Sequence, residues 1–231
     1  MKKVGIVVFP GVNCDMDVHH IIKDVLHGDV RYVWHNETDL SDIGAIVLPG
    51  GFSYGDYLRA GGLAKFSPVM KEVKKLSEKG YPIIGICNGF QILVDSGILP
   101  GAFLKNKTLR FICKFQYIKV VNNNSIFTKN YRKGEILKIP IAHGEGNYYL
   151  EEDELKEVLD NDQIAFQYCD EYGKVSDETN PNGSVYNIAG ILNKNKNVLG
   201  IMPHPERASE QILGSTSGRK ILEALLKNAK S

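Results

Sequence analysis

The pentapeptide Gly85-Ile86-Cys87-Asn88-Gly89 is the segment of this chain best suited to chemistry. An apolar run precedes it and a helical pattern follows it, so Cys87 is expected at a sharp strand-to-helix turn that needs glycines on either side. A thiol at the N-terminus of a helix is stabilised as the thiolate, which is the nucleophilic form. The pattern predicts a nucleophilic cysteine, and the alternative is a buried structural cysteine between two packing glycines.

A second candidate site is Pro203-His204-Pro205-Glu206, which follows the apolar run 198–202. A residue before proline favours extended backbone, and side chains two apart in extended chain point to the same side. Glu206 can then hold the tautomer of His204 while the other ring nitrogen faces a nucleophile. The alternative is a rigid proline-rich turn, but open parallel sheets bind their ligands at such strand ends, which favours catalysis.

The dipeptide Gly50-Gly51 directly follows another apolar run and Pro49. Two glycines at a strand end allow a backbone N–H to turn toward a ligand, as an oxyanion hole requires. Because Gly-Gly is common in ordinary turns, this pattern supports the other two segments and does not identify a site by itself.

Alternating apolar runs and helical patterns in the first hundred residues must position these segments. Near-continuous Val, Ile and Leu runs indicate strands that helices cover on both faces. The alternation predicts an open, mostly parallel α/β sheet. Residues 2–9 imitate the start of a signal peptide, but no small-residue cleavage site follows, which favours a buried strand. The expected strands are 4–9, 30–34, 43–48 and 82–86, and the expected helices are 17–26, 63–79 and 90–95.

The second half of the chain is less regular, and it contains no internal repeat. Residues 170–184 are polar and contain Gly and Pro, so they are expected to form a surface loop. Too little chain follows this loop for a second domain, and we expect one domain over residues 1–231. The expected strands are 115–121, 136–142, 163–169, 185–192 and 198–202, and the expected helices are 152–159 and 215–229.

Composition excludes several classes of function. The 231 residues include 28 Lys or Arg and 27 Asp or Glu, which gives a formal net charge of +1. A dedicated nucleic-acid or membrane-surface binder would carry a basic excess, so we expect neither partner. No apolar run approaches the ~20 residues of a membrane span. The four cysteines form no CxxC pair and no evident disulfide framework, which favours a reducing, cytoplasmic setting.

Other polar residues have simpler interpretations. His19 and His20 are adjacent, so they cannot share a ligand on one helix face and are expected at the surface. Cys113 and Cys169 lie in apolar surroundings and are expected in the core. Cys14 follows the first strand, and a place at the rim of the active site is the less favoured of its two interpretations.

The segment His143-Gly144-Glu145-Gly146 is too poor a ligand set for a metal site. We expect it to form a mobile loop at a partner interface.

Together these segments resemble those of class I (triad-type) glutamine amidotransferases, and the resemblance spans nearly the whole chain. More narrowly, they are similar to one family of that class, the glutaminase subunits of phosphoribosylformylglycinamidine synthases. The resemblance implies a flavodoxin-like fold and a glutaminase that supplies ammonia in de novo purine biosynthesis. The segments that carry it are FPGVNCDMD, LPGGFSYGDYLRAG, GICNGFQIL, IAHGEGNY, MPHPER and GSTSGRK.

The resemblance also implies roles for individual residues. Cys87 attacks the side-chain amide of glutamine, His204 moves the proton, and Glu206 orients the ring. A glutamyl thioester forms, and water then hydrolyses it. The backbone N–H groups of Gly51 and Asn88 hold the oxyanion, and Phe52 and Gln91 form the wall of the glutamine pocket.

The chain contains no GxxxxGK[ST] motif, so amide synthesis requires another chain. The resemblance implies a separate synthetase subunit that carries ATP and Mg, and it is compatible with a third small subunit. No metal or organic cofactor is expected in this chain. The loops 52–61 and 143–149 are the candidate contact surfaces for the synthetase.

Three alternatives remain. One is a glutaminase subunit of another amidotransferase. Another is a cysteine hydrolase on a flavodoxin-like sheet, whose histidine usually follows the cysteine directly; here Asn88 follows it. The third is a non-catalytic binding module with a degenerate site, which the presence of Cys87, His204 and Glu206 argues against.

Overall fold

A nine-stranded sheet runs through the protein in the order β2-β1-β3-β4-β11-β10-β9-β6-β7, and β5 and β8 form a separate two-stranded sheet. The computed structural model describes residues 2–230, so the expected domain ends, residues 1 and 231, lie outside it. The strands are β1 (Lys3–Val8), β2 (Val30–Trp34), β3 (Ile43–Leu48), β4 (Ile83–Ile86), β5 (Ala102–Leu104), β6 (Ile112–Val120), β7 (Ile136–His143), β8 (Asn147–Tyr149), β9 (Ile164–Cys169), β10 (Ile188–Leu192) and β11 (Val198–Ile201).

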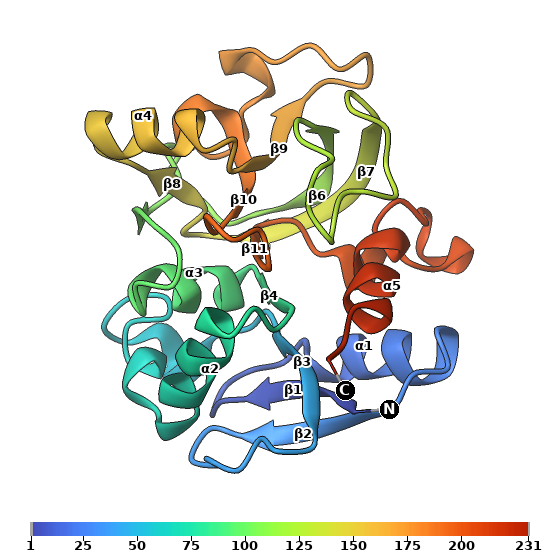
Figure 1. The fold of residues 1–231 in the computed structure, drawn as a ribbon. Helices are drawn as coiled ribbons and strands as arrows, with labels where there is room; N and C mark the ends of the chain where they lie inside the picture. Colours follow the sequence, from blue (N-terminus) through green and yellow to red (C-terminus); the bar gives the residue numbers. More distant parts are fainter. Residues whose placement is uncertain (1, 231) are drawn as a thin grey trace.

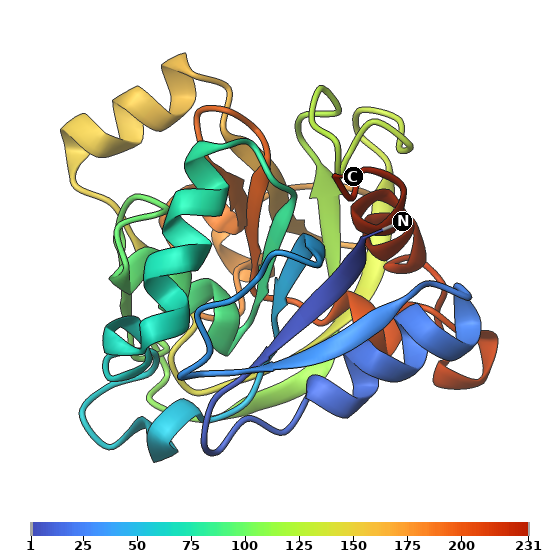
Figure 2. The same ribbon diagram turned by 60° about the horizontal axis from the view of Figure 1, so that its bottom comes forward.

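The main sheet has two halves of different character. From β2 to β11, neighbouring strands pair in parallel. From β11 to β7 they pair antiparallel. The predicted fold class, an open, mostly parallel α/β sheet with helices on both faces, is confirmed. Figure 2 shows β1 and β2 side by side in the parallel half.

Helices cover both faces of the parallel half. Figure 1 shows α2 and α3 on one side of β1, β3 and β4, with α1 and α5 on the other. This explains why every residue of β3 and β4 is buried. The helices are α1 (Asp15–His20), α2 (Pro68–Glu78), α3 (Asn88–Asp95), α4 (Glu152–Asp160) and α5 (Arg219–Lys227).

Several expected elements have different bounds in the structure; the helix expected at 215–229, for example, spans Arg219–Lys227. The helix expected at 63–79 begins at Pro68, because Ser67 is extended at φ −63° and ψ 142° and proline is favoured in the first helical turn. The helix expected at 17–26 ends as α1 at His20 and continues as the π-helix Ile21–Val25. The strand expected at 185–192 begins at Ile188, after the 3₁₀ turn Val185–Asn187.

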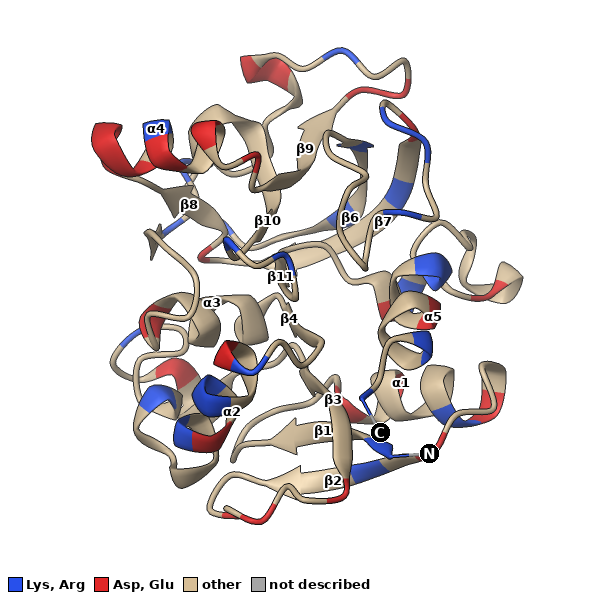
Figure 3. Cartoon of the chain, viewed as in Figure 1, with Lys and Arg blue, Asp and Glu red and all other residues tan. Residues whose placement is uncertain are grey.

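Charges of both signs are mixed on the described surface. Figure 3 shows Lys and Arg beside Asp and Glu on α2 and α5, and acidic residues at the start of α4. Among residues 2–230, no helix is both long and apolar enough to cross a membrane.

Candidate active site

A cavity of about 310 Å³ opens where the parallel strands end, and most of the predicted site residues line it. Glu206 contacts one of them, His204. Asn88 is the first residue of α3, directly after Cys87. The predicted site residues that line the cavity are Gly51, Phe52, Cys87, Gln91 and His204.

Cys87 occupies the predicted strand-to-helix elbow between β4 and α3. Its backbone has φ 49° and ψ −105°, a left-handed conformation that costs a non-glycine residue energy. The turn requires small neighbours, since a Cβ at Gly85 would lie 2.5 Å from Leu93 and one at Gly89 would clash with the carbonyl of Leu48. The backbone N–H of Cys87 donates to Ile201 of β11 at 2.8 Å. The elbow is therefore fixed by both strands that flank β4, namely β3 and β11.

The imidazole of His204 is buried and oriented by a carboxylate. Glu206 Oε1 accepts a hydrogen bond from His204 Nδ1 at 2.6 Å, and the two side chains are 1–2 % exposed. Burial alone would lower the pKa of His204, but the charges of Glu206 and Cys87 outweigh it and raise that pKa well above its usual value. An imidazole held in this way beside a thiol can exchange a proton with it.

Gly51 lines the cavity and Asn88 begins α3, and the backbone N–H groups of these two residues are the predicted oxyanion hole. Gly51 has φ 143°, and a Cβ there would lie 2.7 Å from the backbone nitrogen of Asn13, so only glycine fits this turn. The N–H of Asn88 belongs to the first turn of α3, where backbone donors have no acceptor within the helix. Such free donors can stabilise charge that develops on a carbonyl oxygen.

A hydrogen-bond network joins the two loops at the rim of the cavity. The side chain of Asn88 accepts from Ser53 N at 3.1 Å and donates to Gln91 Oε1 at 3.0 Å and to Asp56 Oδ1 at 3.3 Å. Gln91 Nε2 donates to the carbonyl of Glu145 at 2.6 Å. The loop that follows β3 and the connection that follows β7 are thus linked through the first turn of α3.

The loop after β3 is strained at its centre. Tyr54, Gly55 and Asp56 have consecutive positive φ values of 54°, 71° and 51°. Burial raises the pKa of Asp56 from 3.8 to about 6, with a small further increase from the charge of Glu145. Backbone strain of this kind persists only where the surroundings impose it, and the network through Asn88 supplies that constraint.

Cys14 lies inside the site, contrary to the favoured expectation. It follows the turn after β1, is 3 % exposed and lines the same cavity as Cys87. Arg207 Nη2 donates to its sulfur at 3.1 Å, and Arg207 is held in turn by Asp17 at 3.0 Å. The cause of the error is that Arg207 and His204 come to Cys14 from the far end of the chain.

The expectation of a mobile loop at residues 143–146 is wrong at His143. This residue ends β7 and is 3 % exposed. Its Nδ1 donates to Asn106 Oδ1 at 3.1 Å, and its Nε2 accepts from Asn182 at 3.4 Å, which defines a neutral imidazole. Burial, followed by the charge of His204, lowers the pKa of His143 to about 4. The two asparagines anchor the residue that the flanking glycines suggested would be free.

The other two cysteines and His20 differ in their exposure to solvent. Cys169 is buried, as expected, but Cys113 is exposed. The start of β6, where Cys113 lies, pairs only with β7, because β9 joins β6 from Tyr117 onward. His20 is exposed at the surface, as expected.

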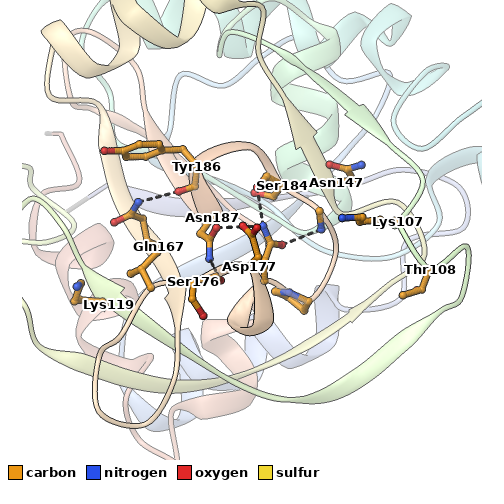
Figure 4. A pocket seen from close by; sticks show the side chains of 14 residues that line it. Lys107, Thr108, Lys119, Asn147, Gln167, Ser176, Asp177, Ser184, Tyr186 and Asn187 are labelled. Carbon is orange, nitrogen blue, oxygen red and sulfur yellow. Dashed lines mark hydrogen bonds between the residues drawn. The ribbon is translucent and has the colours of Figure 1, made fainter.

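A larger cavity of about 820 Å³ lies elsewhere, against β9 and the 170–187 region. Figure 4 shows its side chains, which hydrogen-bond one another: Asn180 with Asn187, and Gln167 with the carbonyl of Tyr186. None of its lining residues is a cysteine or a histidine. Size therefore does not identify the reactive site.

Sequence reasoning missed Asp56, Glu145, Arg207 and the side-chain role of Asn88. Each lies inside one of the motif segments, and that position is the only sequence signal that points to it. Their partners are distant in sequence, however, and only the fold brings them together.

Comparisons with known proteins agree with this geometry. Residues 1–227 match the model of the CobB/CobQ-like glutamine amidotransferase domain. The chain is 54% identical over 224 residues to phosphoribosylformylglycinamidine synthase subunit PurQ of Chlorobium luteolum, with 97% of each chain covered.

Two solved structures extend the comparison. PurLQS from Thermotoga maritima superposes with a TM-score of 0.86 at 42% identity, over 98% of this chain and 99% of that chain. The glutaminase domain of Trypanosoma brucei CTPS with bound acivicin shares the fold at a TM-score of 0.59 and 14% identity, over 100% of this chain and 96% of that one. The chain therefore belongs to the CobB/CobQ-like glutamine amidotransferase family, as a relative of the PurQ subunits of phosphoribosylformylglycinamidine synthase.

Proposed function

We propose that this chain is the glutaminase subunit of a phosphoribosylformylglycinamidine synthase. It hydrolyses glutamine to glutamate and ammonia, and a separate ATP-dependent synthetase uses the ammonia in de novo purine biosynthesis. The observation that carries the proposal is one cavity lined by both Cys87 and His204, with Glu206 2.6 Å from the imidazole Nδ1. The 54% identity to a PurQ subunit supports the choice of synthase.

In the first half-reaction, His204 takes the proton of the Cys87 thiol, and the thiolate attacks the side-chain amide carbon of glutamine. The backbone N–H groups of Gly51 and Asn88 stabilise the oxyanion that forms. The imidazolium then gives its proton to the leaving nitrogen, and ammonia departs. A glutamyl thioester on Cys87 remains.

In the second half-reaction, His204 removes a proton from water, which attacks the thioester carbonyl. The same two N–H groups stabilise the second oxyanion. Collapse of this intermediate breaks the carbon–sulfur bond, returns the proton to Cys87 and releases glutamate. Glu206 holds the imidazole in one orientation throughout, so one residue serves both steps.

Phe52 and Gln91 form the wall of the glutamine pocket in this proposal. Phe52 is 48% exposed at the rim, while Gln91 is 4% exposed and fixed by Asn88 and Glu145. The glutaminase reaction uses only the groups named above, so this chain needs no metal or organic cofactor. ATP and Mg belong to the synthetase.

The partner and the location follow from the same relatives. The solved relative at 42% identity is a chain of PurLQS, so we infer a synthetase partner for this chain and, with it, a third small subunit. All four cysteines are free, as in proteins of reducing compartments, which supports a cytoplasmic location.

The test is glutamate production by the chain alone, with its synthetase, and with the synthetase plus its nucleotide substrates. We expect weak activity alone and a rise of about a hundredfold in the full complex, which needs only ~2.7 kcal/mol of differential binding. Absence of glutamate release in the full complex would reject the glutaminase assignment. Equal turnover in all three would reject coupling and leave the glutaminase in place.

A further inference from the structure

The side chains of Cys14 and Glu206, which differ in chemistry, lie close to the active-site imidazole of His204. The sulfur of Cys14, a ring nitrogen of His204 and a carboxylate oxygen of Glu206 all lie within 4.8 Å of one another, and all three residues are buried. Cys14 comes from the turn after β1, whereas His204 and Glu206 come from the turn after β11. None of the steps proposed for glutamine hydrolysis uses Cys14.

Two polar atoms of this cluster have no hydrogen-bond partner within residues 2–230. They are His204 Nε2 and Glu206 Oε2, on side chains that are no more than 2 % exposed. A buried polar atom without a partner is costly and calls for an explanation. Catalysis accounts for His204 Nε2, which faces the proton transfer with Cys87. It does not account for the second oxygen of Glu206.

Gly50 lies against both Cys14 and one edge of the imidazole of His204. A Cβ on Gly50 would lie 3.2 Å from the Cys14 sulfur, 2.8 Å from His204 Cε1 and 3.4 Å from His204 Nδ1. Cys14 and the Cε1–Nδ1 edge of the ring therefore both face Gly50, and Glu206 binds the ring at Nδ1. The absence of a side chain at Gly50 leaves this space open.

Sulfur, imidazole nitrogen and carboxylate oxygen together suit Zn²⁺ and not the hard cations Mg²⁺ or Ca²⁺, which prefer oxygen alone. Tetrahedral zinc places such ligand atoms roughly 3.4–3.6 Å apart. The three atoms lie within 4.8 Å of one another, so no pair needs to close by more than about 1.4 Å.

We propose that Cys14, His204 and Glu206 form a Zn²⁺ site whose occupation switches off glutamine hydrolysis. Binding releases the thiol proton of Cys14 to solvent, the proton that His204 Nδ1 donates to Glu206 moves to Nε2, and water completes the four ligands. The metal takes the Nδ1 lone pair and the Glu206 carboxylate, so Glu206 no longer orients the ring for Cys87. Binding itself is independent of the proposed function, whereas the loss of activity rests on it.

The binding test is titration of the purified full-length chain with Co²⁺, a spectroscopic substitute for Zn²⁺, followed by competition with Zn²⁺. Wild type should bind one ion with a thiolate-to-cobalt charge-transfer band. Cys14→Ser should lose the band and weaken Zn²⁺ binding by more than the roughly 10–100-fold that loss of an outer-shell partner costs. Cys113→Ser, which removes an exposed cysteine, is the matched control and should bind as wild type.

One further variant and an assay of the complex make the test decisive. Cys87→Ser, which abolishes hydrolysis, should keep the charge-transfer band, so binding is read even if the glutaminase assignment fails. In the complex, Zn²⁺ should inhibit glutamine-dependent synthesis by wild type much more than by Cys14→Ser, with ammonia-dependent synthesis as the control for the synthetase. Equal Zn²⁺ affinity in wild type and Cys14→Ser, or a band that follows Cys87, would overturn the proposal.

Discussion

Cys14 and Cys87 each occupy the N-cap of a helix that follows a strand of the parallel half of the sheet. Both are buried, and both line the cavity that contains His204. The charge of Cys87 raises the pKa of this imidazole, and a hydrogen bond with Cys14 raises it further. A helix N-terminus and a neighbouring histidine are therefore common to both thiols.

The backbone and the surroundings distinguish them. Cys87 has φ 49° and follows β4 directly, whereas Cys14 has φ −102° and follows β1 through a turn. The sulfur of Cys14 is held by Arg207 and by Asn13 Oδ1 at 3.3 Å, while Cys87 has one long contact, 3.6 Å, to the carbonyl of Ala142.

The two helices also differ in charge. The first turn of α1 carries Asp15 and Asp17, whose charges oppose a thiolate at Cys14, and the first turn of α3 carries no acidic residue. Proximity to the imidazole therefore does not by itself make a cysteine the nucleophile. The elbow presents a thiol with few competing contacts beside uncharged helix donors.

The largest expected effect is that of Cys87→Ala. Without the nucleophile, glutamine-dependent synthesis by the complex should fall by about 10⁴-fold or more, on the scale of losses at other catalytic nucleophiles. Ammonia-dependent synthesis should survive, because the acceptor chemistry lies on the synthetase. Steady-state rates with glutamine and with an ammonium salt measure both.

Chemical labelling provides the control for that variant. A glutamine-like electrophile should modify Cys87 far faster than Cys14, Cys113 or Cys169, as read by mass spectrometry. Label found mainly on Cys14 would show that Cys14, and not Cys87, is the nucleophile.

Glu206→Gln should give the next largest loss, about 10²–10⁴-fold in kcat, as when a triad carboxylate is replaced by its amide. Because the Glu206 carboxylate raises the pKa of His204, the variant imidazolium loses its proton at lower pH. Because only the neutral imidazole can take the Cys87 proton, the acidic limb of the rate profile should move to lower pH. A rate profile whose acidic limb stays in place would show that Glu206 does not act through His204.

The parts of the site that the sequence revealed are those whose partners are close along the chain. Cys87 is identified by its own glycines, and His204 by Glu206 two residues later. The role of Cys14 depends on Arg207, and the burial of His143 depends on Asn106 and Asn182. Such long-range contacts leave no periodicity or spacing to detect.

The two halves of the sheet differ in how well the sequence predicts burial, again because of long-range contacts. Strands of the parallel half are buried on both faces, so apolar runs predicted β3 and β4 within about a residue. In the antiparallel half, burial depends on which neighbour covers each residue. Cys113 therefore lies exposed in an apolar segment, because β9 does not reach it.

Asp56→Asn tests whether the network at Asn88 supports the elbow of Cys87. Burial raises the Asp56 pKa from 3.8 to about 6, so the folded protein favours the protonated form. Stability is thus present below pH ~4 and is lost as pH rises through ~6. The thermal midpoint of Asp56→Asn relative to wild type should increase over this range, with a several-fold change in glutaminase rate.

The matched control is Asp39→Asn, at an exposed carboxylate whose pKa is lowered by the hydrogen bonds of Ser41. It should gain no stability over the same range. A flat difference between Asp56→Asn and wild type from pH 4 to 7 would contradict the assignment.

The smallest effect on glutaminase activity is expected for Cys14→Ser. This variant checks most directly that Cys14 and Cys87 have different roles. Serine keeps a donor and acceptor for Arg207 and Asn13 in nearly the same volume, so Cys14→Ser should cost less than about 1.5 kcal/mol of stability. In metal-free buffer with a chelator, its kcat/KM for glutamine should stay within about threefold of wild type, roughly 0.7 kcal/mol of barrier. Denaturant unfolding and steady-state glutamate release measure the two quantities. If Cys14→Ser were as inactive as Cys87→Ala while still folded, the two thiols would act as one catalytic unit, and the distinction drawn from the elbow would fail.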